Sequence, residues 1–547
     1  MAVINFDINY FKNLLKKDIS KEKIIEDLPF SGFVVEDFKD NELSVEITPN
    51  RPDCLSAEGL ARHFRGFLDV EKGLPKYKVK KSNYVVKVDD KVSKVRPYIA
   101  NAVVKNVNLT DNLIKSIMQV QEKIHETLGR KRKKIAIGFY DLDKINFPIT
   151  YTTTKPEKNA FVPLEFKEKL TPKEILKKHP KGIDYKYTLK GFKEYPMLID
   201  NKGIILSLIP IINSERSKVE ADTKNLFIDV TGTDKNLVSK VLTILATMLA
   251  EIGGDIYSVK VKYNNESVLH PILKEESMKV DVKYINRLLG LNLNEKEVKN
   301  LLQKARMDYI KGKAIYPFYR VDIMHPMDIV EEVAIAYDYR NFEPIIPNIF
   351  TTGEEDKLEI FSRRIRELMV GFKGLEVVNY ILTNEDWQFK KMNFNGKAIE
   401  LIESKSDIYN QCKSWLLPGL MLVYSNNKNN EYPQIIFELD DAINPDTGKS
   451  ERKLAFGIAK SNSNFNEVKS VLISLLKILG FKNVKFVAKN HPSFINGRCA
   501  YVKINNEEIG FLGEIHPKVI KNWGLEIPIS AFEISVQKLF NLYNKNY

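Results

Sequence analysis

The chain has 547 residues, of which 44% are hydrophobic and 28% are charged. This length predicts about three to five domains, and this composition excludes a chain that is disordered over most of its length. The formal net charge of +13 favours a polyanionic partner such as RNA, although a lysine-rich composition produces the same excess without any partner.

The cysteines and the lengths of the apolar runs exclude further classes of protein. Cys54, Cys412 and Cys499 are far apart and form no CxxC pair, which excludes a zinc site or a disulfide framework and suits a reducing compartment. The N-terminus lacks the layout of a signal peptide, and the apolar runs at 203–212 and 241–250 are shorter than the roughly 20 residues of a membrane span. We expect a cytoplasmic protein with no membrane segment.

The first region, residues 1–90, is predicted to be a small α/β domain. Strand-like segments VVEDF and LSVEIT precede the turn TPNRPD, and a helix follows over about 55–68 with Ser56 as its N-cap. The second region, residues 91–265, has two predicted helices, at 111–129 and 234–253. Its predicted strands are PYIANAVVKNV, KIAIGFYDL, GIILSLIPII and NLFIDVTG.

The third region, residues 268–345, begins with the strand MKVDV, and Asn294 with Glu297 forms the capping-box pattern of a helix start. The fourth region, residues 348–547, contains an amphipathic helix over 356–370 and another over about 466–479. Strands are predicted at VVNYIL, QIIFEL, KLAFGIA, KFVAK, CAYVKI and IGFLGEI. This pattern predicts an antiparallel sheet flanked by helices.

Four acids surround the start of a predicted helix in the third region. Asp328, Glu331 and Glu332 follow Pro326 at helical spacing, and Asp322 lies just before the helix. Carboxylates that converge repel one another unless a cation lies between them, and hard oxygen ligands suit Mg²⁺. The alternative is that acids favour a helix N-terminus because of its dipole.

The segment RVDIMHPMDIVEEVAIAYDY, residues 320–339, resembles the signature of the small acidic domain in phenylalanyl-tRNA synthetase beta subunits. Further segments resemble that family in order along the chain: ITPNRPDCLSAEGLARHFRGFL, HETLGRKRKKIAIGFYDLDKI, IPIINSERSKVEADTKNLFIDVTGTD, SWLLPGLMLVYSNN, YPQIIFEL, HPSFINGRCAYV and IGFLGEIHPKVI. The resemblance implies that Asp322, Asp328, Glu331 and Glu332 bind Mg²⁺ near the interface with an alpha subunit.

The resemblance also implies an overall organisation. The expected fold is α+β and multidomain, with an editing module, a small acidic metal-site domain and a class II synthetase-like antiparallel-sheet core without catalytic motifs. Bacterial members carry two further domains for which this chain has no room, so we expect the archaeal or eukaryotic type. The family attaches phenylalanine to tRNA(Phe) using ATP, with the active site on the alpha subunit and two copies of each chain.

The residues of the fourth region agree with a core that does not bind ATP. The segment IIFEL has no arginine shortly before it, and IGFLGEIHP lacks the arginine of the third class II motif. Phosphate loops, HExxH and nucleophile elbows are absent from the sequence. Arg498 either imitates a phosphate-binding arginine or, as we favour, makes structural hydrogen bonds. We therefore expect a scaffold that works with a catalytic partner.

An editing site is expected because an apolar pocket rejects the extra hydroxyl of tyrosine by only about a hundredfold. The resemblance places this site in the second region, where Asn213, Glu215, Asp229 and Thr231 are the candidates. Asp229 would accept the tyrosine hydroxyl proton, while Thr231 and Asn213 would orient the ester or a water. The alternative is that these residues only cap strand ends. Ser214 replaces a glycine that the family usually has, which leaves open an editing-defective scaffold or tRNA-binding subunit.

A run of basic residues precedes the strand KIAIGFYDL. Arg130, Lys131, Arg132 and Lys133 are candidates for binding tRNA phosphates, and the alternative is a solvated turn with no partner. A third reading of the whole chain is a stand-alone nucleic-acid-binding protein. The expected partners are thus the alpha subunit and tRNA(Phe).

Overall fold

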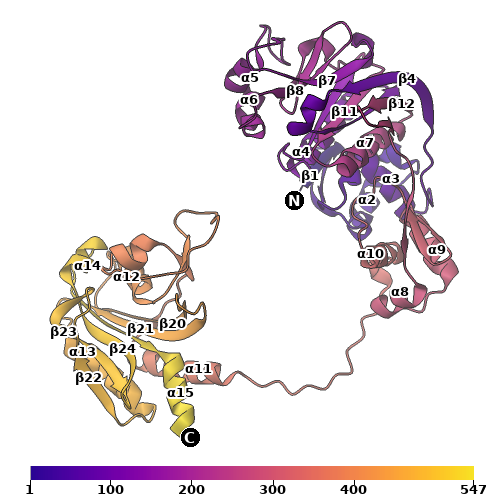
Figure 1. Cartoon of the computed structure of the whole chain (residues 1–547). Helices are drawn as coiled ribbons and strands as arrows, with labels where there is room; N and C mark the ends of the chain where they lie inside the picture. Colours follow the sequence, from indigo (N-terminus) through magenta and orange to yellow (C-terminus); the bar gives the residue numbers. More distant parts are fainter. Residues whose placement is uncertain (1, 547) are drawn as a thin grey trace. The chain divides into compact units, whose positions relative to one another are not determined.

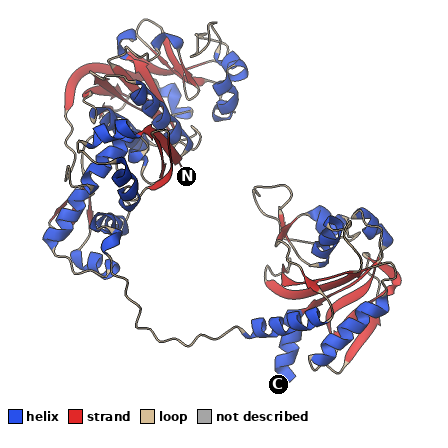
Figure 2. Ribbon diagram, turned by 180° about the vertical axis from the view of Figure 1, so that it is seen from behind, coloured by secondary structure: helices blue, strands red, loops and turns tan. Residues whose placement is uncertain are grey.

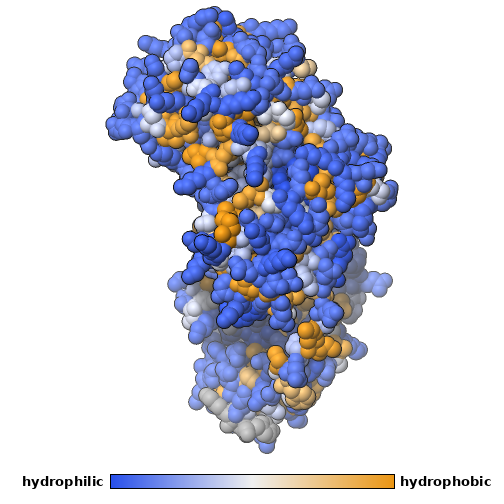
Figure 3. All heavy atoms as spheres, turned by 90° about the vertical axis from the view of Figure 1, so that its right-hand side faces the viewer, coloured by the Kyte–Doolittle hydropathy of each residue, from blue (hydrophilic) through white to orange (hydrophobic). Residues whose placement is uncertain are grey.

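The computed structural model describes residues 2–546, which form two compact units, Met1–Ile346 and Pro347–Tyr547. Both units mix helices with sheets, so the α+β expectation is confirmed (Figure 1, Figure 2). Among the described residues no helix is both long and apolar enough to cross a membrane. The face seen in Figure 3 is mainly hydrophilic, with hydrophobic residues in scattered patches.

The chain begins with a three-stranded antiparallel sheet in the order β1-β3-β2. Its elements are β1 (Ala2–Asp7), α1 (Ile8–Leu15), α2 (Lys21–Asp27), β2 (Val34–Lys39), β3 (Glu42–Ile47) and α3 (Ala57–Phe67). The Ser56 side chain accepts a hydrogen bond from the Gly59 amide, which confirms the predicted N-cap of α3. Every residue of α3 except Phe67 is buried, so this helix is central to the packing of its unit.

The second sheet has ten strands, in the order β10-β9-β8-β7-β4-β12-β5-β11-β6, with β13 paired to β12. The strands are β4 (Val79–Val88), β5 (Tyr98–Lys105), β6 (Ile135–Asp141), β7 (Ile149–Thr154), β8 (Tyr195–Ile199), β9 (Ile205–Leu208), β10 (Ile212–Asn213), β11 (Leu226–Gly232), β12 (Asp255–Lys262) and β13 (Ser267–His270). Strand β4 pairs in parallel with β12 and β7, so it belongs to this sheet although the sequence grouped it with residues 1–90.

Two long helices pack on this sheet, α4 (Asp111–Glu126) and α7 (Lys235–Ala250). Asp111 is the first residue of α4 and not its cap, because the Thr110 side chain accepts from the Leu113 amide. Two short helices, α5 (Pro172–Lys178) and α6 (Pro180–Tyr185), lie together beyond β8 at one end of the sheet (Figure 1). The strand expected over 203–212 is β9 alone, because Pro210 has no amide to donate to a ladder.

The third region contains a small antiparallel sheet in the order β14-β16-β15 and three helices. Its elements are β14 (Glu276–Lys279), α8 (Val282–Leu289), α9 (Glu295–Lys304), β15 (Asp308–Ile310), β16 (Lys313–Tyr316) and α10 (Pro326–Tyr337). The capping box of Asn294 and Glu297 at the start of α9 is confirmed. Helix α10 starts at Pro326 as expected, and its Asp328 side chain reaches back to the amide of the N-cap residue His325.

A seven-stranded sheet in the order β17-β20-β21-β25-β24-β23-β22 organises the second unit, and all its pairs are antiparallel except β17 with β20. Its strands are β17 (Leu375–Glu376), β20 (Gln434–Ile443), β21 (Ser450–Ala459), β22 (Val484–Ala488), β23 (Phe494–Ile504), β24 (Glu507–Ile515) and β25 (Ile529–Ser535). Around them are α11 (Lys357–Gly371), α12 (Leu417–Asn426), α13 (Phe465–Ile478), α14 (Pro517–Asn522), α15 (Val536–Asn546) and the pair β18 (Leu382–Thr383) and β19 (Gln411–Cys412).

The strand predicted at VVNYIL does not form as one strand. Strand β17 ends before this segment, and β18 starts at its last residue. The residues between these two strands belong to no strand. The amide of Asn379 donates to the Glu438 carboxylate instead of to a neighbouring backbone, and its side-chain amide does the same. In the middle of this segment, the Glu438 carboxylate therefore takes the place of the backbone carbonyl that a neighbouring strand would provide.

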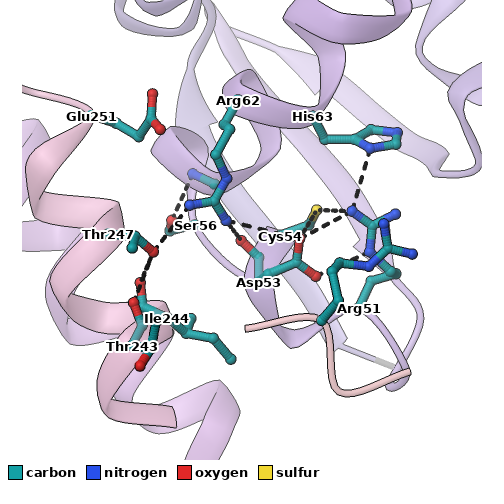
Figure 4. A network of polar contacts seen from close by, with 12 residues as sticks. Arg51, Asp53, Cys54, Ser56, Arg62, His63, Thr243, Ile244, Thr247 and Glu251 are labelled. Carbon is teal, nitrogen blue, oxygen red and sulfur yellow. Dashed lines mark hydrogen bonds and ion pairs between the residues drawn. The ribbon is translucent and has the colours of Figure 1, made fainter. Parts of the chain in front are cut away.

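A buried polar network joins the first region to helix α7 (Figure 4). The Arg62 guanidinium on α3 donates to Thr247 Oγ1 on α7 at 3.1 Å and to the Asp53 carbonyl at 3.3 Å. Arg51 pairs with the Asp53 carboxylate at 3.0 Å and lies 3.3 Å from His63 Nδ1. Because each charge has a partner of opposite sign or a carbonyl, the network can be buried without an unpaired ion.

Candidate functional site

A cavity of about 360 Å³ lies in the first unit, between α4, β6, the segment around β9 and β10, and strand β11. Its apolar lining includes Ile117, Met118, Ile137, Leu208, Ile209 and Ile211. Its polar lining includes Arg132, Tyr140, Ser207, Asn213, Asp229 and Thr231. Three of the four editing candidates therefore meet in one cavity, and the fourth, Glu215, is not among the lining residues.

Strand β11 places Asp229 and Thr231 on the same face, because alternate residues of a strand point to the same side. The residues that alternate with them along the strand, Ile228 and Val230, belong to the hydrophobic core that contains α4 and α7. In the sheet Asp229 is opposite Gly138 of the neighbouring strand β6. A methyl group at Gly138 would lie 2.3 Å from Asp229 Oδ1, so this glycine makes the space that the carboxyl group occupies.

Asp229 lines the cavity and is 2% exposed. Burial raises the pKa of Asp229 to about 7, while a hydrogen bond from the Tyr140 hydroxyl and the charge of Arg96 act in the opposite direction. The Tyr140 hydroxyl also lies 2.9 Å from Ser207 Oγ. The wall of the cavity thus contains a buried carboxyl group whose pKa is raised.

Thr231 accepts hydrogen bonds from a buried arginine, Arg96. Arg96 Nε donates to Thr231 Oγ1 at 3.0 Å, and Arg96 Nη2 donates to the Thr231 carbonyl at 2.8 Å. The same guanidinium donates to the carbonyls of Arg132 and Lys133. Burial lowers the pKa of Arg96 to about 10. Since Thr231 Oγ1 accepts from Arg96, its own proton is available to a group in the cavity.

Asn213 lines the cavity, and its side-chain amide donates to the Phe139 carbonyl at 3.1 Å. Ser214 has φ of −80°, so its backbone does not need the glycine that the family usually has there. Glu215 accepts from the Glu165 amide at 3.0 Å and pairs with Lys218 at 3.1 Å. Its carboxylate therefore holds the neighbouring loop together, and its predicted place in the site is not supported.

The four basic residues at 130–133 differ in their exposure to solvent. Arg132 is buried, donates to the Pro210 and Ile211 carbonyls and pairs with Glu122 at 2.8 Å. It therefore supports the cavity wall and is not a free phosphate ligand. Arg130, Lys131 and Lys133 are exposed. Arg130, Lys131 and Arg132 all have φ between 46° and 65°, so the backbone makes a left-handed turn here.

Three of the four acids of the third region have partners within the protein. Arg320 pairs with both Asp322 at 2.6 Å and Glu332 at 2.5 Å, and Arg51 lies 3.5 Å from Glu332. Asp328 accepts from the amides of Met324 and His325. No group of three or more potential ligand side chains is arranged for a metal among residues 2–546.

The expectation of Mg²⁺ held by Asp322, Asp328, Glu331 and Glu332 is thus not supported. The reason is that arginines supply the positive charge that the carboxylates need. Glu331 is exposed and lies beside Tyr339, whose pKa is raised by burial and by that carboxylate. The dipole and capping explanation accounts for Asp328.

Comparisons with known proteins match this architecture. Three family models cover consecutive parts of the chain: the B3/4 domain over 80–252, the tRNA synthetase B5 domain over 278–339 and the phenylalanyl tRNA synthetase beta chain CLM domain over 343–536. The phenylalanine–tRNA ligase beta subunit of Methanocaldococcus jannaschii is 42% identical over 98% of this chain and all of its own length. The chain belongs to the phenylalanine–tRNA ligase beta-subunit family.

Other members of the phenylalanine–tRNA ligase beta-subunit family agree. The beta subunit of Pyrococcus abyssi is 43% identical over 90% of both chains. The crystal structure of an N-terminal fragment of the phenylalanyl-tRNA synthetase beta subunit from Pyrococcus horikoshii is 41% identical, with a TM-score of 0.59 over 61% of this chain and 99% of the fragment. The cavity of this beta-subunit family member falls within the B3/4 match.

Several residues of the site were not found from the sequence. Arg96, Tyr140 and Ser207 come from three separate strands or turns, and only the sheet order brings them together. Gly138 could have been noticed in the sequence, because a glycine inside a buried strand of bulky residues indicates that another group approaches the backbone closely. The same rule applied to IAIGFYD would have indicated that a ligand or side chain lies against β6.

Proposed function

We propose that this chain works with an alpha subunit to attach phenylalanine to tRNA(Phe), and that its cavity hydrolyses tyrosine wrongly attached to that tRNA. The observation that carries the hydrolytic part is the buried carboxyl group of Asp229 in the wall of a largely apolar cavity. The family membership supports the synthetase part.

Selection of tyrosine would follow from that oxygen. The apolar walls, among them Ile137 and Ile209, take an aromatic ring, and the Asp229 carboxyl group accepts a hydrogen bond from the phenol. Tyrosine gains this hydrogen bond and phenylalanine does not, a difference of about 1–3 kcal/mol. A site built to hydrogen-bond a hydroxyl discriminates more strongly than an apolar pocket that merely lacks room for one.

Hydrolysis requires a water to attack the ester carbonyl carbon, after which the bond to the terminal ribose oxygen breaks and that oxygen takes a proton. Thr231 can donate to the ester because its hydroxyl oxygen already accepts from Arg96. Asn213 uses its amide nitrogen for the Phe139 carbonyl, which leaves its carbonyl oxygen to orient a water. These residues act by positioning and hydrogen bonding.

The second unit would serve as a class II-like scaffold, with ATP bound by the alpha subunit. Glu438 of the IIFEL segment is buried and pairs with Lys413 at 2.9 Å. Arg498 pairs with Glu514 at 2.6 Å, as the structural reading of that arginine expected. Both support a core that uses its charges internally. A stable assembly of two alpha and two beta chains on co-expression is the expected result.

The hydrolytic proposal is tested with the co-expressed complex and tRNA(Phe) charged with radioactive tyrosine. Asp229→Ala is expected to slow deacylation by about 10- to 100-fold, because the phenol loses its buried acceptor. Asp222→Ala, which changes an exposed aspartate near the same strand, is the matched control and should deacylate like wild type. A wild-type complex that leaves Tyr-tRNA(Phe) intact would contradict the proposal.

A further inference from the structure

The second unit contains a pocket of about 430 Å³. Its walls come from the segment that leads into β18, a short π-helix at Asp386–Lys390, the chain around β19 and the first turns of α12. A π-helix is rare and occurs frequently at functional sites. The volume falls within the range of about 300–1,000 Å³ that is usual for small-molecule sites.

Four aromatic residues line this pocket: Tyr380, Trp387, Tyr409 and Trp415. The Tyr409 ring contacts two of the others, with its centre 5.8 Å from that of Tyr380 and 6.1 Å from that of Trp387. It is nearly perpendicular to both rings, at 82° and 83°. We call Tyr380, Trp387 and Tyr409 the aromatic corner.

Two rings of the aromatic corner lie outside the hydrophobic core. Tyr380 is 77% exposed, and among the described residues neither Tyr380 nor Tyr409 belongs to the core clusters of the second unit. Their burial therefore does not account for their presence beside the pocket. Exposed apolar side chains that gather around a pocket mark a site of interaction.

The charges beside the pocket disfavour an anionic ligand. Among the lining residues that the structure describes, Lys413 is the only charged one. Its ammonium is buried and already pairs with Glu438 at 2.9 Å and with Asp440 at 2.6 Å. One ammonium between two carboxylates leaves an excess of negative charge, so a phosphate or carboxylate group in the pocket would find no free counter-charge.

The aromatic corner suits a cation better than a flat ring. The face of an aromatic ring carries partial negative charge, which attracts a positive group. Methylated ammonium groups are bound by several such rings at once, because their charge is spread over apolar methyl groups. A flat ligand stacks best on rings parallel to it, and the corner sets its rings at right angles. Leu382, Pro418 and Leu422 give the pocket an apolar wall for the methyl groups.

We propose that this pocket binds a small organic ammonium ion with apolar substituents, such as a methylated amine, with its positive charge against the aromatic corner. Three observations carry the proposal: the perpendicular rings, their position outside the core and the neutralised Lys413. The pocket and the hydrolytic cavity belong to different units, so this site goes beyond the proposed function and does not depend on it.

The test uses the full chain with choline as the probe, followed by saturation-transfer NMR of the choline methyl protons. The matched ligand is 3,3-dimethyl-1-butanol, which has the shape of choline and carries no charge. Choline is expected to bind saturably, with a Kd on the order of 1 mM, and about 10-fold more tightly than the alcohol.

Substitution of Tyr409 tests the aromatic corner directly. Tyr409→Leu keeps an apolar side chain and removes the ring, so it should weaken choline binding by about 5- to 30-fold. It should change the binding of the alcohol by no more than about twofold, because only a cation uses the face of the ring. Tyr409→Phe keeps the ring and should bind choline like wild type.

A matched control comes from the same unit. The Tyr501 ring also holds a cation, since the Lys489 ammonium lies 4.0 Å from its centre, but Tyr501 does not line the pocket. Tyr501→Leu should therefore bind choline like wild type. Near-UV circular dichroism verifies that each variant is folded.

The outcomes that would overturn the proposal are distinct. Equal affinity of the wild-type chain for choline and the alcohol would show that the pocket recognises shape alone, and unchanged choline binding by Tyr409→Leu would place the ligand elsewhere. The complex with an alpha subunit should bind choline as the single chain does. Loss of binding in that complex would also overturn the proposal, because the pocket would then take a side chain of that subunit. Deacylation of Tyr-tRNA(Phe) is a separate readout, and its failure would leave choline binding unaffected.

Discussion

Asp229 is the residue on which the proposed chemistry depends. Its neighbours in the sheet create a small polar space inside an apolar wall, because Gly138 leaves room and the Tyr140 hydroxyl lies beside the carboxyl group. Burying a carboxyl group in an apolar wall destabilises the fold. A ligand hydroxyl in the cavity would offset part of this cost by donating a hydrogen bond to the carboxyl group.

The raised pKa of Asp229 predicts a pH-dependent stability. The folded pKa of about 7 exceeds the unfolded value of 3.8, so between these values the unfolded chain releases a proton that the folded chain keeps. The free energy of unfolding should therefore fall as pH rises from about 4 to 7, by about 4 kcal/mol from this group, and then level off. Asp229→Asn should lose this component.

The measurement is urea denaturation at several pH values, followed by pulsed hydrogen exchange of peptides from β11. This readout reports the first unit alone, which matters because all three tryptophans, at 387, 415 and 523, are in the second. An equal pH slope in wild type and Asp229→Asn would show that Asp229 titrates normally.

The sequence was informative about individual residues where a family motif covers them. Asn213, Asp229 and Thr231 were predicted, and the structure brings them to one cavity. Glu215 was also predicted from its motif, but its carboxylate turns to a loop amide that no local pattern reveals. Arg96 was missed, since its hydrogen bonds reach 135 residues along the chain to Thr231.

At the scale of elements, helix α10 shows that a correctly predicted helix does not settle what its acidic residues bind. The sequence predicted its start at Pro326 and its acidic face, but the cations that neutralise Asp322 and Glu332 are Arg320 and the distant Arg51. Spacing along one helix cannot reveal a partner that lies 281 residues away. The capping signals of α3 and α9 were predictable because they are local.

Removal of Arg320 tests this account of the acids. Arg320→Ala should lower the free energy of opening of α10 by about 3–5 kcal/mol, because two buried carboxylates lose their counter-charge. Hydrogen exchange of the α10 amides, read by mass spectrometry, measures the effect. Lys173→Ala, which removes an exposed pair with Glu157, is the control and should leave the exchange of the α10 amides unchanged. Strong stabilisation of the wild-type chain by millimolar Mg²⁺ would support a metal site instead.

At the scale of the whole molecule, the boundary expected between residues 345 and 348 coincides with the division into two units, whereas the arrangement of the large sheet was not predictable. The four expected regions follow composition and turn signals, yet β4 leaves the first of them to pair with β7 and β12. Parallel pairing between strands about 60 and 170 residues apart gives no local signal in the sequence. The cavity depends on that sheet, because its walls come from α4, β6, β9 and β11.

The most direct test of the central claim is a crystal structure of the full chain with a non-hydrolysable tyrosyl-adenosine amide, a stable mimic of the charged tRNA end. The account predicts the tyrosine ring inside the cavity, with its hydroxyl within about 2.5–3.0 Å of an Asp229 carboxyl oxygen. It also predicts weaker binding of the phenylalanyl analogue. A ligand bound outside the cavity, or one with its hydroxyl directed away from Asp229, would contradict it.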